Sequence, residues 1–459
     1  MKTTLSSLLF IAGISSILFL SSFYRSSDNP SPTQTEDRKE RGAISMRSAF
    51  ENAYYTRNDR VGHFYTEVKS GQASENTSER SPMNLSVVID RSGSMAGEKI
   101  RNARLAACFL VDQLNENDIL SIVIYDGSVD VLQSAIHVSN RSAIKAKINQ
   151  IIDRGGTNLM GGAAEGYAQV KRNYRSQYIN RVLLLSDGLA NEGITDPSQI
   201  RNIVRSKSMN EDITLSTFGV GRDYNEDLMT AMAENGNGNY YFIDNSEKIS
   251  SIFEKELHGL STVITRNTVL NIQIPDHVTI EKVYGNTYVQ EGRTLSIRFN
   301  TLFSNETKGI LIRYRVDPAY NTPVNFYSNL SYVDQERKLA INLQNRSDFT
   351  NNKELYIDNF NAWVGAQVTA YESNEILESA MREVDKGHYD EAKKLVKQNE
   401  TYIQSKPAAV RNAPEVKSAS VVNANYTSKL DDVEEMPVED VKFMQKDTKS
   451  SNYLLRNKK

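Results

Sequence analysis

The chain has 459 residues, with 54 lysines and arginines against 57 aspartates and glutamates, for a formal net charge of −3. This length predicts two or three domains, each with its own core. The near-neutral charge, without a basic stripe that carries interleaved aromatic residues, excludes nucleic acid and anionic membrane surfaces as expected partners. The single cysteine, Cys108, excludes a disulfide bond within the chain.

The first 25 residues differ from the rest of the chain in hydropathy. An uncharged segment lies between Lys2 and Arg25, and its apolar residues are densest from Leu8 to Leu20. This pattern indicates that residues 1–25 are a cleavable signal peptide or an uncleaved N-terminal membrane anchor. In either case we expect the protein to be exported to the periplasm or the cell surface, with membrane association only through this segment.

The next part of the chain is expected to hold a linker and an α/β domain. Residues 26–60 are polar and contain prolines, which favours a linker. The domain is expected over residues 61–260, with a first strand at Val61–Ser70 and its core at residues 84–260. In this core, uninterrupted apolar runs alternate with segments of helical spacing. Strands of that kind are buried on both faces, so the pattern predicts a mainly parallel sheet between two layers of helices.

The pattern changes twice after residue 260. Residues 261–350 alternate apolar and polar side chains between glycine, proline, asparagine and aspartate, which predicts a β-sandwich-like accessory domain. Residues 351–405 return to helical spacing and are expected to form a helical hairpin joined at Gly387. Residues 406–459 are polar with few apolar anchors, so we expect an extended or partly disordered tail.

Aspartates stand at the ends of three of the predicted parallel strands. The run "VVID" ends at Asp90, "SIVIYD" ends at Asp126, and "RVLLLSD" ends at Asp187. In sheets of this type the ligand site lies beyond the carboxyl ends of the strands. The sequence therefore predicts a functional site at this edge of the sheet.

Oxygen-bearing side chains gather around two of these aspartates. Asp90 is followed by Ser92 and Ser94 in "DRSGS", and Thr157 lies in the glycine-rich loop "RGGTNLMGG". Oxygens without histidine or thiolate favour a hard divalent cation, Mg²⁺ or alternatively Ca²⁺ or Mn²⁺, over zinc or copper. Because only Asp90 and Asp187 carry negative charge, the ion would stay electrophilic and could accept a carboxylate from a partner molecule.

Each part of this set also has an ordinary structural explanation. Ser92 or Ser94 could cap a helix that begins near Glu98, since serine is a favourable N-cap residue. Thr157 could be an ordinary loop residue, and Asp187 could be a turn former before glycine. The occurrence of all parts in this order, each at a strand or loop end, favours the metal site.

Residues 84–260 resemble a von Willebrand factor type A domain. The motifs "VVIDRSGSM", "GGTNLMGG" and "VLLLSDGLANEGIT" are similar to the metal-ion-dependent adhesion site of that family. More narrowly, the chain resembles exported bacterial proteins described as calcium-activated chloride channel homologues, and the inter-alpha-trypsin inhibitor heavy chains. The resemblance covers well under half of the chain.

The resemblance implies both a fold and a ligand set. The fold is a Rossmann-like, doubly wound sheet with one antiparallel edge strand, which we place at Val129–Ile136. Three hydroxyls would coordinate the ion directly, and two carboxylates would act directly or through water. In this chain the hydroxyls belong to Ser92, Ser94 and Thr157, and the carboxylates to Asp90 and Asp187.

Catalysis is not expected. The five histidines form no H-E-x-x-H motif, and the chain has no G-x-S-x-G or P-loop sequence. Glu98 and Glu192 lie near the predicted site in sequence, but we interpret them as solvated or capping carboxylates rather than as a general base. A metal-assisted hydrolase is therefore the least favoured function. After Arg25 no apolar stretch is long enough to span a membrane, which excludes a helical pore.

The expected function is a metal-dependent protein-binding module for adhesion or complex assembly at the cell envelope. Its divalent cation would take an aspartate or glutamate carboxylate from a partner protein. The alternative is a structural subunit of an envelope complex, in which the metal only stabilises the fold.

Overall fold

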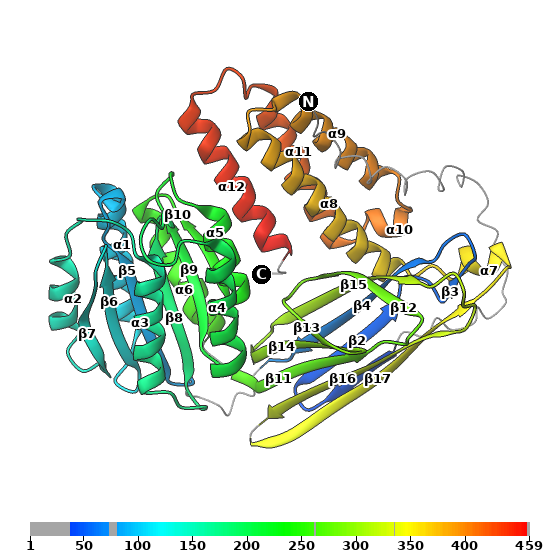
Figure 1. The fold of residues 1–459 in the computed structure, drawn as a ribbon, viewed down its shortest axis with the longest axis horizontal. Helices are drawn as coiled ribbons and strands as arrows, with labels where there is room; N and C mark the ends of the chain where they lie inside the picture. Colours follow the sequence, from blue (N-terminus) through cyan, green and yellow to red (C-terminus); the bar gives the residue numbers. More distant parts are fainter. Residues whose placement is uncertain (1–36, 73–79, 261–262, 335, 457–459) are drawn as a thin grey trace. The chain divides into compact units, whose positions relative to one another are not determined.

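The computed structural model describes residues 37–72, 80–260, 263–334 and 336–456 (Figure 1). The leader expected at residues 1–25 lies outside these ranges. Within them, no helix combines the length and the apolar character needed to cross a membrane.

A six-stranded sheet forms the centre of the α/β domain. Its strands are β5 (Met83–Asp90), β6 (Ile119–Tyr125), β7 (Val129–His137), β8 (Ile179–Ser186), β9 (Thr214–Val220) and β10 (Asn237–Ile243). The order across the sheet is β10-β9-β8-β5-β6-β7, and all neighbours are parallel except β7, which runs antiparallel to β6. The mainly apolar strands β5, β6 and β8 are buried along their whole length. The predicted mainly parallel sheet with an antiparallel edge strand is confirmed.

Two layers of helices cover this sheet. The helices are α1 (Glu98–Gln113), α2 (Arg141–Asn149), α3 (Leu159–Arg172), α4 (Pro197–Glu211), α5 (Glu226–Asn235) and α6 (Ile249–Leu260). One core joins α1, α2 and α6 to one face, and another joins α3, α4 and α5 to the other. Val87 and Ile89 of β5 lie in the first core and Val88 in the second, because successive strand residues point to opposite faces.

A β-sandwich of two sheets forms the second domain. One sheet contains, in order, β1 (Asp37–Arg41), β2 (Ile44–Phe50), β4 (Val61–Ser70), β15 (Thr307–Val316) and β12 (Val278–Tyr284). The other contains, in order, β13 (Val289–Glu291), β14 (Thr294–Phe303), β11 (Val263–Gln273), β16 (Val324–Asp334), β17 (Arg337–Phe349) and β3 (Tyr54–Tyr55). Apolar residues of both sheets form a single core between them.

The sandwich includes strands from before the α/β domain, which corrects two predictions. The segment expected as a linker at residues 26–60 contains β1, β2 and β3. The strand Val61–Ser70, expected in the α/β domain, instead pairs with β15 and places Phe64 in the sandwich core. Alternation of apolar residues identifies a strand but not its partner, and here the whole α/β domain separates the two paired segments in sequence.

The C-terminal region is largely helical where it is described. Its helices are α7 (Lys353–Asp358), α8 (Ala362–Asp385), α9 (Tyr389–Gln404), α10 (Ala408–Arg411), α11 (Pro414–Asp431) and α12 (Val438–Arg456). The helices α8 and α9 form the predicted hairpin, and Gly387 lies in the turn between them.

The tail expected at residues 406–459 is instead helical over most of its length up to residue 456, so that prediction is wrong. The few apolar side chains of α11 and α12, among them Tyr426 and Met444, pack in one core with α8 and α9. Buried amides add hydrogen bonds to this core, as between Asn399 Nδ2 and Asn423 Oδ1 at 2.8 Å. Sparse apolar residues are sufficient here because neighbouring helices complete the core and buried polar groups find partners.

The helix α12 also contacts the α/β domain (Figure 1). The ring of Tyr453 lies 5.3 Å from that of Tyr240 in β10. The Nζ atom of Lys446 donates a hydrogen bond to the backbone carbonyl of Tyr224, at 2.7 Å, in the loop between β9 and α5. The end of the described chain is therefore held against the loop that follows β9.

Replacing Phe64 with alanine tests whether β4 belongs to the sandwich. The ring of Phe64 lies 5.1 Å from that of Phe50 and 5.0 Å from that of Phe326. Because removal of a buried ring leaves a cavity, we expect Phe64→Ala to lower the free energy of unfolding by about 3–5 kcal/mol. The measurement is urea unfolding followed by the fluorescence of Trp363, the only tryptophan, whose ring lies 5.0 Å from that of Tyr65 in β4.

Tyr327→Ala is the matched control, because Tyr327 is 47% exposed on the same sandwich. We expect this control to change the free energy of unfolding by less than about 1 kcal/mol. Equal effects of the two substitutions would contradict the burial of β4 in the sandwich core.

Candidate metal centre

The buried strand β5 ends in a carboxylate that three neighbours hold in place. Asp90 is fully buried. Its Oδ1 atom accepts a hydrogen bond from the backbone amide of Ser92 at 2.9 Å. Its Oδ2 atom accepts hydrogen bonds from the hydroxyls of Tyr125 at 2.9 Å and Ser186 at 2.6 Å. These contacts fix the direction of the carboxylate at the end of the strand.

Burial raises the pKa of Asp90, although the hydrogen bonds from Ser186 and Ser92 act to lower it. The nearby negative charge of Asp187 raises the pKa further. The carboxylates of Asp90 and Asp187 therefore repel each other electrostatically. A positive charge placed between or beside them would stabilise both.

The hydroxyl oxygens of Ser92 and Ser94 lie 3.0 Å apart. Two neighbouring ligands at about 2.1 Å from an octahedral Mg²⁺ are themselves about 3.0 Å apart, so this spacing fits one edge of such an ion. Ser92 is buried and Ser94 is exposed, which brings the edge that they form to the surface of the domain.

The alternative role of these serines as helix caps is wrong. The helix α1 begins at Glu98, its N-cap residue is Gly97, and no side chain caps it. Ser92 precedes the short 3₁₀ turn Gly93–Met95 but does not cap that turn with its hydroxyl either. The hydroxyls of Ser92 and Ser94 therefore do not cap either helical segment.

Backbone contacts bring the second loop to the first. The amide of Gly93 donates a hydrogen bond to the carbonyl of Gly155 at 3.1 Å. Gly155 has a φ of +71°, which glycine adopts without strain. Two residues later Thr157 is buried, and its amide donates to Asn191 Oδ1 at 2.8 Å. Within the described ranges no residue forms a hydrogen bond with the Thr157 hydroxyl, which leaves that oxygen available as a ligand.

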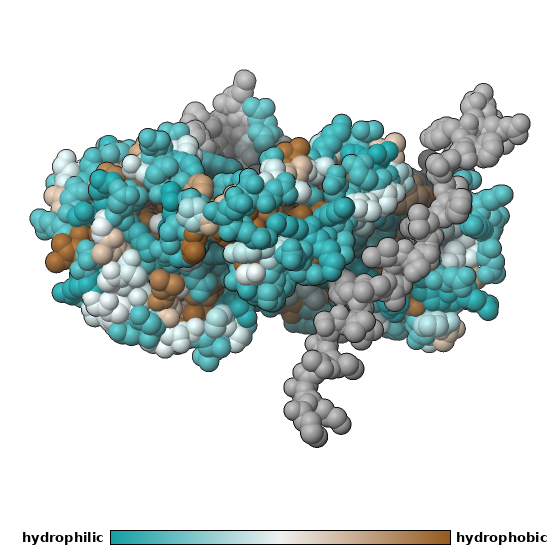
Figure 2. Space-filling view, turned by 90° about the horizontal axis from the view of Figure 1, so that it is seen from above, coloured by the Kyte–Doolittle hydropathy of each residue, from teal (hydrophilic) through white to brown (hydrophobic). Residues whose placement is uncertain are grey.

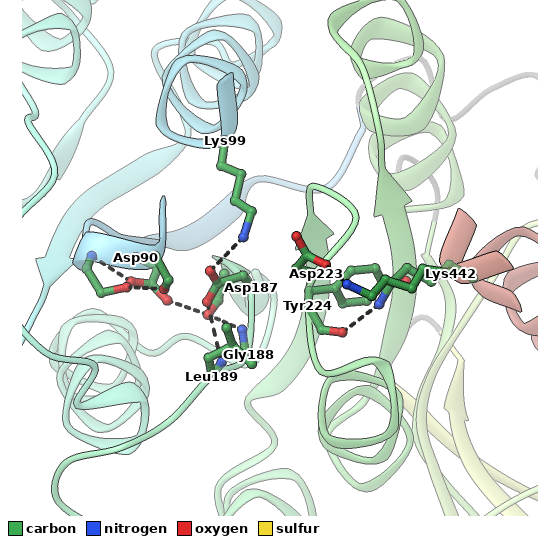
Figure 3. Close-up of polar contacts among 12 residues, drawn as sticks. Asp90, Lys99, Asp187, Gly188, Leu189, Asp223, Tyr224 and Lys442 are labelled. Carbon is green, nitrogen blue, oxygen red and sulfur yellow. Dashed lines mark hydrogen bonds and ion pairs between the residues drawn. The ribbon is translucent and has the colours of Figure 1, made fainter. Parts of the chain in front are cut away.

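The third loop provides Asp187, which is fully buried at the end of β8. Its Oδ2 atom lies 3.1 Å from the Nζ atom of Lys99. Figure 3 shows these two side chains pointing toward each other. Its Oδ1 atom accepts a long hydrogen bond of 3.4 Å from the amide of Leu189. The positive charge of Lys99 therefore lies directly against a predicted metal ligand.

Sequence reasoning missed Lys99. It lies in the first turn of α1, the helix that follows the loop with Ser92 and Ser94. A lysine at that position is placed close to the carboxyl ends of the strands, and this placement is the signal that could have identified it.

Asp126, the third strand-end aspartate, takes part in ion pairs that support the loops. Its Oδ2 atom lies 2.9 Å from the Nε atoms of both Arg91 and Arg154. Burial acts to raise the pKa of Asp126, but hydrogen bonds from Ser128 and Arg154 and the charge of Arg91 lower it to about 2. Because Arg91 and Arg154 flank the first two site loops, Asp126 joins these loops to the end of β6.

Glu192 lies at the surface, in the loop after β8. Its carboxylate contacts the backbone positions of Gly127 and Gly156, where an added Cβ would lie 2.6 Å and 1.8 Å from its oxygens. In the described part of the chain, no group of three or more acidic, histidine or cysteine side chains could hold a metal ion. The candidate donor set accordingly combines two carboxylates with three hydroxyls.

Comparison with known proteins identifies the fold of this region. Residues 84–255 match the family model of the von Willebrand factor type A domain. A solved structure, described as von Willebrand factor type A from Catenulispora acidiphila, has a TM-score of 0.67 and 16% identity, and covers 85% of this chain and 91% of that one. This structural likeness shows the fold alone.

Two relatives in sequence match only parts of their own length. The protein YfbK of Escherichia coli (strain K12), described as uncharacterized, is 34% identical over 204 residues, which are 44% of this chain and 35% of YfbK. Inter-alpha-trypsin inhibitor heavy chain H3 of Mesocricetus auratus is 28% identical over 165 residues, which are 34% of this chain and 18% of that protein. The chain thus spans about a third of YfbK and under a fifth of the heavy chain.

The role of Asp126 can be tested through acid stability. Because its pKa is lowered to about 2 in the folded protein, Asp126 stabilises the fold above the pKa of about 3.9 that aspartate has when unfolded. This contribution is lost as pH falls from about 4 towards 2. We expect Asp126→Asn to lower the free energy of unfolding by about 1–2 kcal/mol at pH 7, and by less at pH 3.

The measurement is urea unfolding at both pH values, followed by circular dichroism. Asp112→Asn is the control, because Asp112 is an exposed partner of Lys145 and its ion pair is expected to contribute little. A loss for Asp126→Asn that is equal at pH 7 and pH 3 would contradict the ion-pair role.

Proposed function

Because residues 84–255 form a von Willebrand factor type A domain, we propose that this chain is a metal-dependent protein-binding module. Domains of this family typically mediate interactions between proteins. In the proposed module, an exposed divalent cation takes an aspartate or glutamate carboxylate from a partner protein. The observation that carries the proposal is the pair of hydroxyls of Ser92, which is buried, and Ser94, which is exposed, 3.0 Å apart beside the buried carboxylates of Asp90 and Asp187.

The donor set fits a hard cation such as Mg²⁺, with Ca²⁺ and Mn²⁺ as alternatives. We propose that Ser92, Ser94 and Thr157 hold the ion through their hydroxyls. Asp90 and Asp187 act directly or through water, and their burial keeps them fixed. When bound, the ion supplies a positive charge that attracts an anionic ligand. The two carboxylates balance the double charge of the ion, and the other ligands are neutral hydroxyls, so the ion stays electrophilic enough to accept a further carboxylate at an open position.

Apolar side chains next to the site support a protein partner. Leu189 is 41% exposed and Ile194 is 39% exposed, and both belong to the loop that follows Asp187. On the face seen in Figure 2, hydrophilic residues dominate and hydrophobic residues form small separate patches. These features favour recognition of one charged group with a few apolar contacts around it, rather than a broad apolar interface.

The same observations support a binding role over a structural one. If the metal only stabilised the fold, its absence would leave buried carboxylates without a counter-charge. Lys99 already provides that charge to Asp187. We therefore propose that the metal is used for partner capture, and that a structural subunit is the second candidate.

We propose no catalytic role for the site. Glu98 is highly exposed and bonds to Arg101 at 2.7 Å, and Glu192 is exposed. Solvated carboxylates of this kind are poor candidates for a general base. We place the module at the cell envelope because of the leader expected at residues 1–25, which lies outside the described residues.

Thr157→Val tests the proposed ligand set with little change in shape. Removal of this hydroxyl is expected to weaken Mg²⁺ binding about tenfold, which corresponds to about 1.4 kcal/mol. The measurement is isothermal titration of the purified protein with MgCl₂. Thr279→Val is the control, because Thr279 is an exposed residue of the sandwich strand β12.

Partner capture from native membranes, by cross-linking in Mg²⁺ and in EDTA, tests the binding role. We expect capture in Mg²⁺ that is lost in EDTA and reduced in Thr157→Val. Capture that is equal in Mg²⁺ and EDTA would contradict the proposal. A rise in melting temperature with Mg²⁺, without any metal-dependent capture, would favour the structural subunit.

A further inference from the structure

Lys99 lies between the metal centre and the loop that follows β9, residues 221–225. Its side chain is only 17% exposed, and its Nζ atom lies 3.1 Å from Asp187 Oδ2. Its methylene groups lie against Gly221, where an added Cβ would be 2.8 Å from Lys99 Cγ and 2.7 Å from Cε. The close contact requires glycine at this position, which also has a φ of +83°.

The same loop offers a second carboxylate to Lys99. Asp223 accepts a hydrogen bond from Lys442 of α12 at 2.9 Å, and this bond is the main cause that lowers the pKa of Asp223. The charge of Lys99 lowers that pKa as well. Figure 3 shows the ammonium group of Lys99 with Asp187 on one side and Asp223 on the other.

The loop is joined both to the metal centre and to α12. The amide of Asn225 donates a hydrogen bond to the backbone carbonyl of Asp187 at 2.8 Å. The Nζ atom of Lys446 donates to the carbonyl of Tyr224 at 2.7 Å, and also lies 2.9 Å from Glu226. A change in the charge around Asp187 can therefore reach α12 through a short series of contacts.

A divalent ion and an ammonium group compete for Asp187. Two positive charges a few ångströms apart in a partly buried site repel each other by several kcal/mol at an effective dielectric constant of about 20. Lysine has a flexible stem and can redirect its charge. The side chain of Asp223 is 54% exposed, and its ion-pair partner Lys442 is 44% exposed, so Asp223 can accept a second cation.

We propose that Lys99 is a resident counter-ion that a divalent cation displaces from Asp187 to Asp223, and that this exchange loosens the contact between Asp223 and Lys442 of α12. The inference rests on the proposed metal centre. It makes Lys99 a determinant of metal affinity, since each binding event must first release its ammonium group. It also makes α12 the element that responds to the state of the metal site.

Lys99→Met tests the first part, because methionine keeps the apolar stem and removes the charge. We expect the variant to bind Mg²⁺ at least about tenfold more tightly than the wild type in isothermal titration. Its melting temperature in EDTA should fall, and Mg²⁺ should restore it. Lys145→Met is the control, because Lys145 pairs with the exposed Asp112 on the protein surface, and its Mg²⁺ affinity should equal that of the wild type.

Hydrogen exchange of the full chain tests the second part. In the wild type, saturating Mg²⁺ should speed amide exchange in residues 438–456 at least about threefold. Asp223→Asn keeps the metal ligands and Lys99 but removes the second carboxylate. In this variant we expect Mg²⁺ to bind without a change of exchange in α12, and the variant also provides a test if Lys99→Met does not fold.

The outcomes separate this inference from the proposed function. If the wild type binds Mg²⁺ but Lys99→Met binds it no more tightly, the counter-ion role is overturned while the metal centre stands. If exchange in α12 is the same with and without Mg²⁺, the link to α12 is overturned. If the wild type binds no Mg²⁺ at all, both the inference and the proposed function fail.

Discussion

Two buried carboxylates at the ends of neighbouring parallel strands set the constraint for the rest of the site. Asp90 ends β5 and Asp187 follows β8, and these strands pair along most of their length. Burial and the charge of Asp187 both raise the pKa of Asp90. A protein with no use for this arrangement would gain by replacing one of the carboxylates, because buried like charges are costly. The positive charge of Lys99 compensates one of them, and a divalent cation held with the nearby hydroxyls could compensate both.

The fold provides this arrangement through its topology. Parallel strands bring their carboxyl ends to one edge of the sheet, so loops far apart in sequence meet there. The hydrogen bond from Gly93 to Gly155 and the ion pairs of Asp126 join the first two loops. The hydrogen bond from Thr157 to Asn191 joins the second loop to the loop after β8. The hydrogen bond from Asn225 to Asp187 joins that loop to the one after β9. The loop after β9 in turn contacts α12, so this edge of the sheet is in contact with the C-terminal helices.

Much of the α/β domain could be predicted from its sequence, because its strands are continuous apolar runs whose burial does not depend on distant segments. The candidate ligands could be chosen for the same reason, since Asp90 and Asp187 directly follow such runs. The assignment of β4 to the sandwich could not be predicted, because β4 pairs with β15, which lies beyond the α/β domain in the sequence. The helices after residue 406 were missed because Tyr426 and Met444 are buried only by neighbouring helices. Lys99 was missed because a lysine in the first turn of a helix is usually solvated, whereas the folded structure places this one against Asp187.

The most direct test of the charge balance at Asp90 and Asp187 is a crystal structure of the protein soaked with Mn²⁺. Anomalous diffraction would locate the ion. We expect an anomalous peak among the hydroxyls of Ser92, Ser94 and Thr157, and an ammonium group of Lys99 that no longer contacts Asp187. A structure in which Lys99 still pairs with Asp187 at saturating Mn²⁺, with no peak beside the three hydroxyls, would contradict this interpretation.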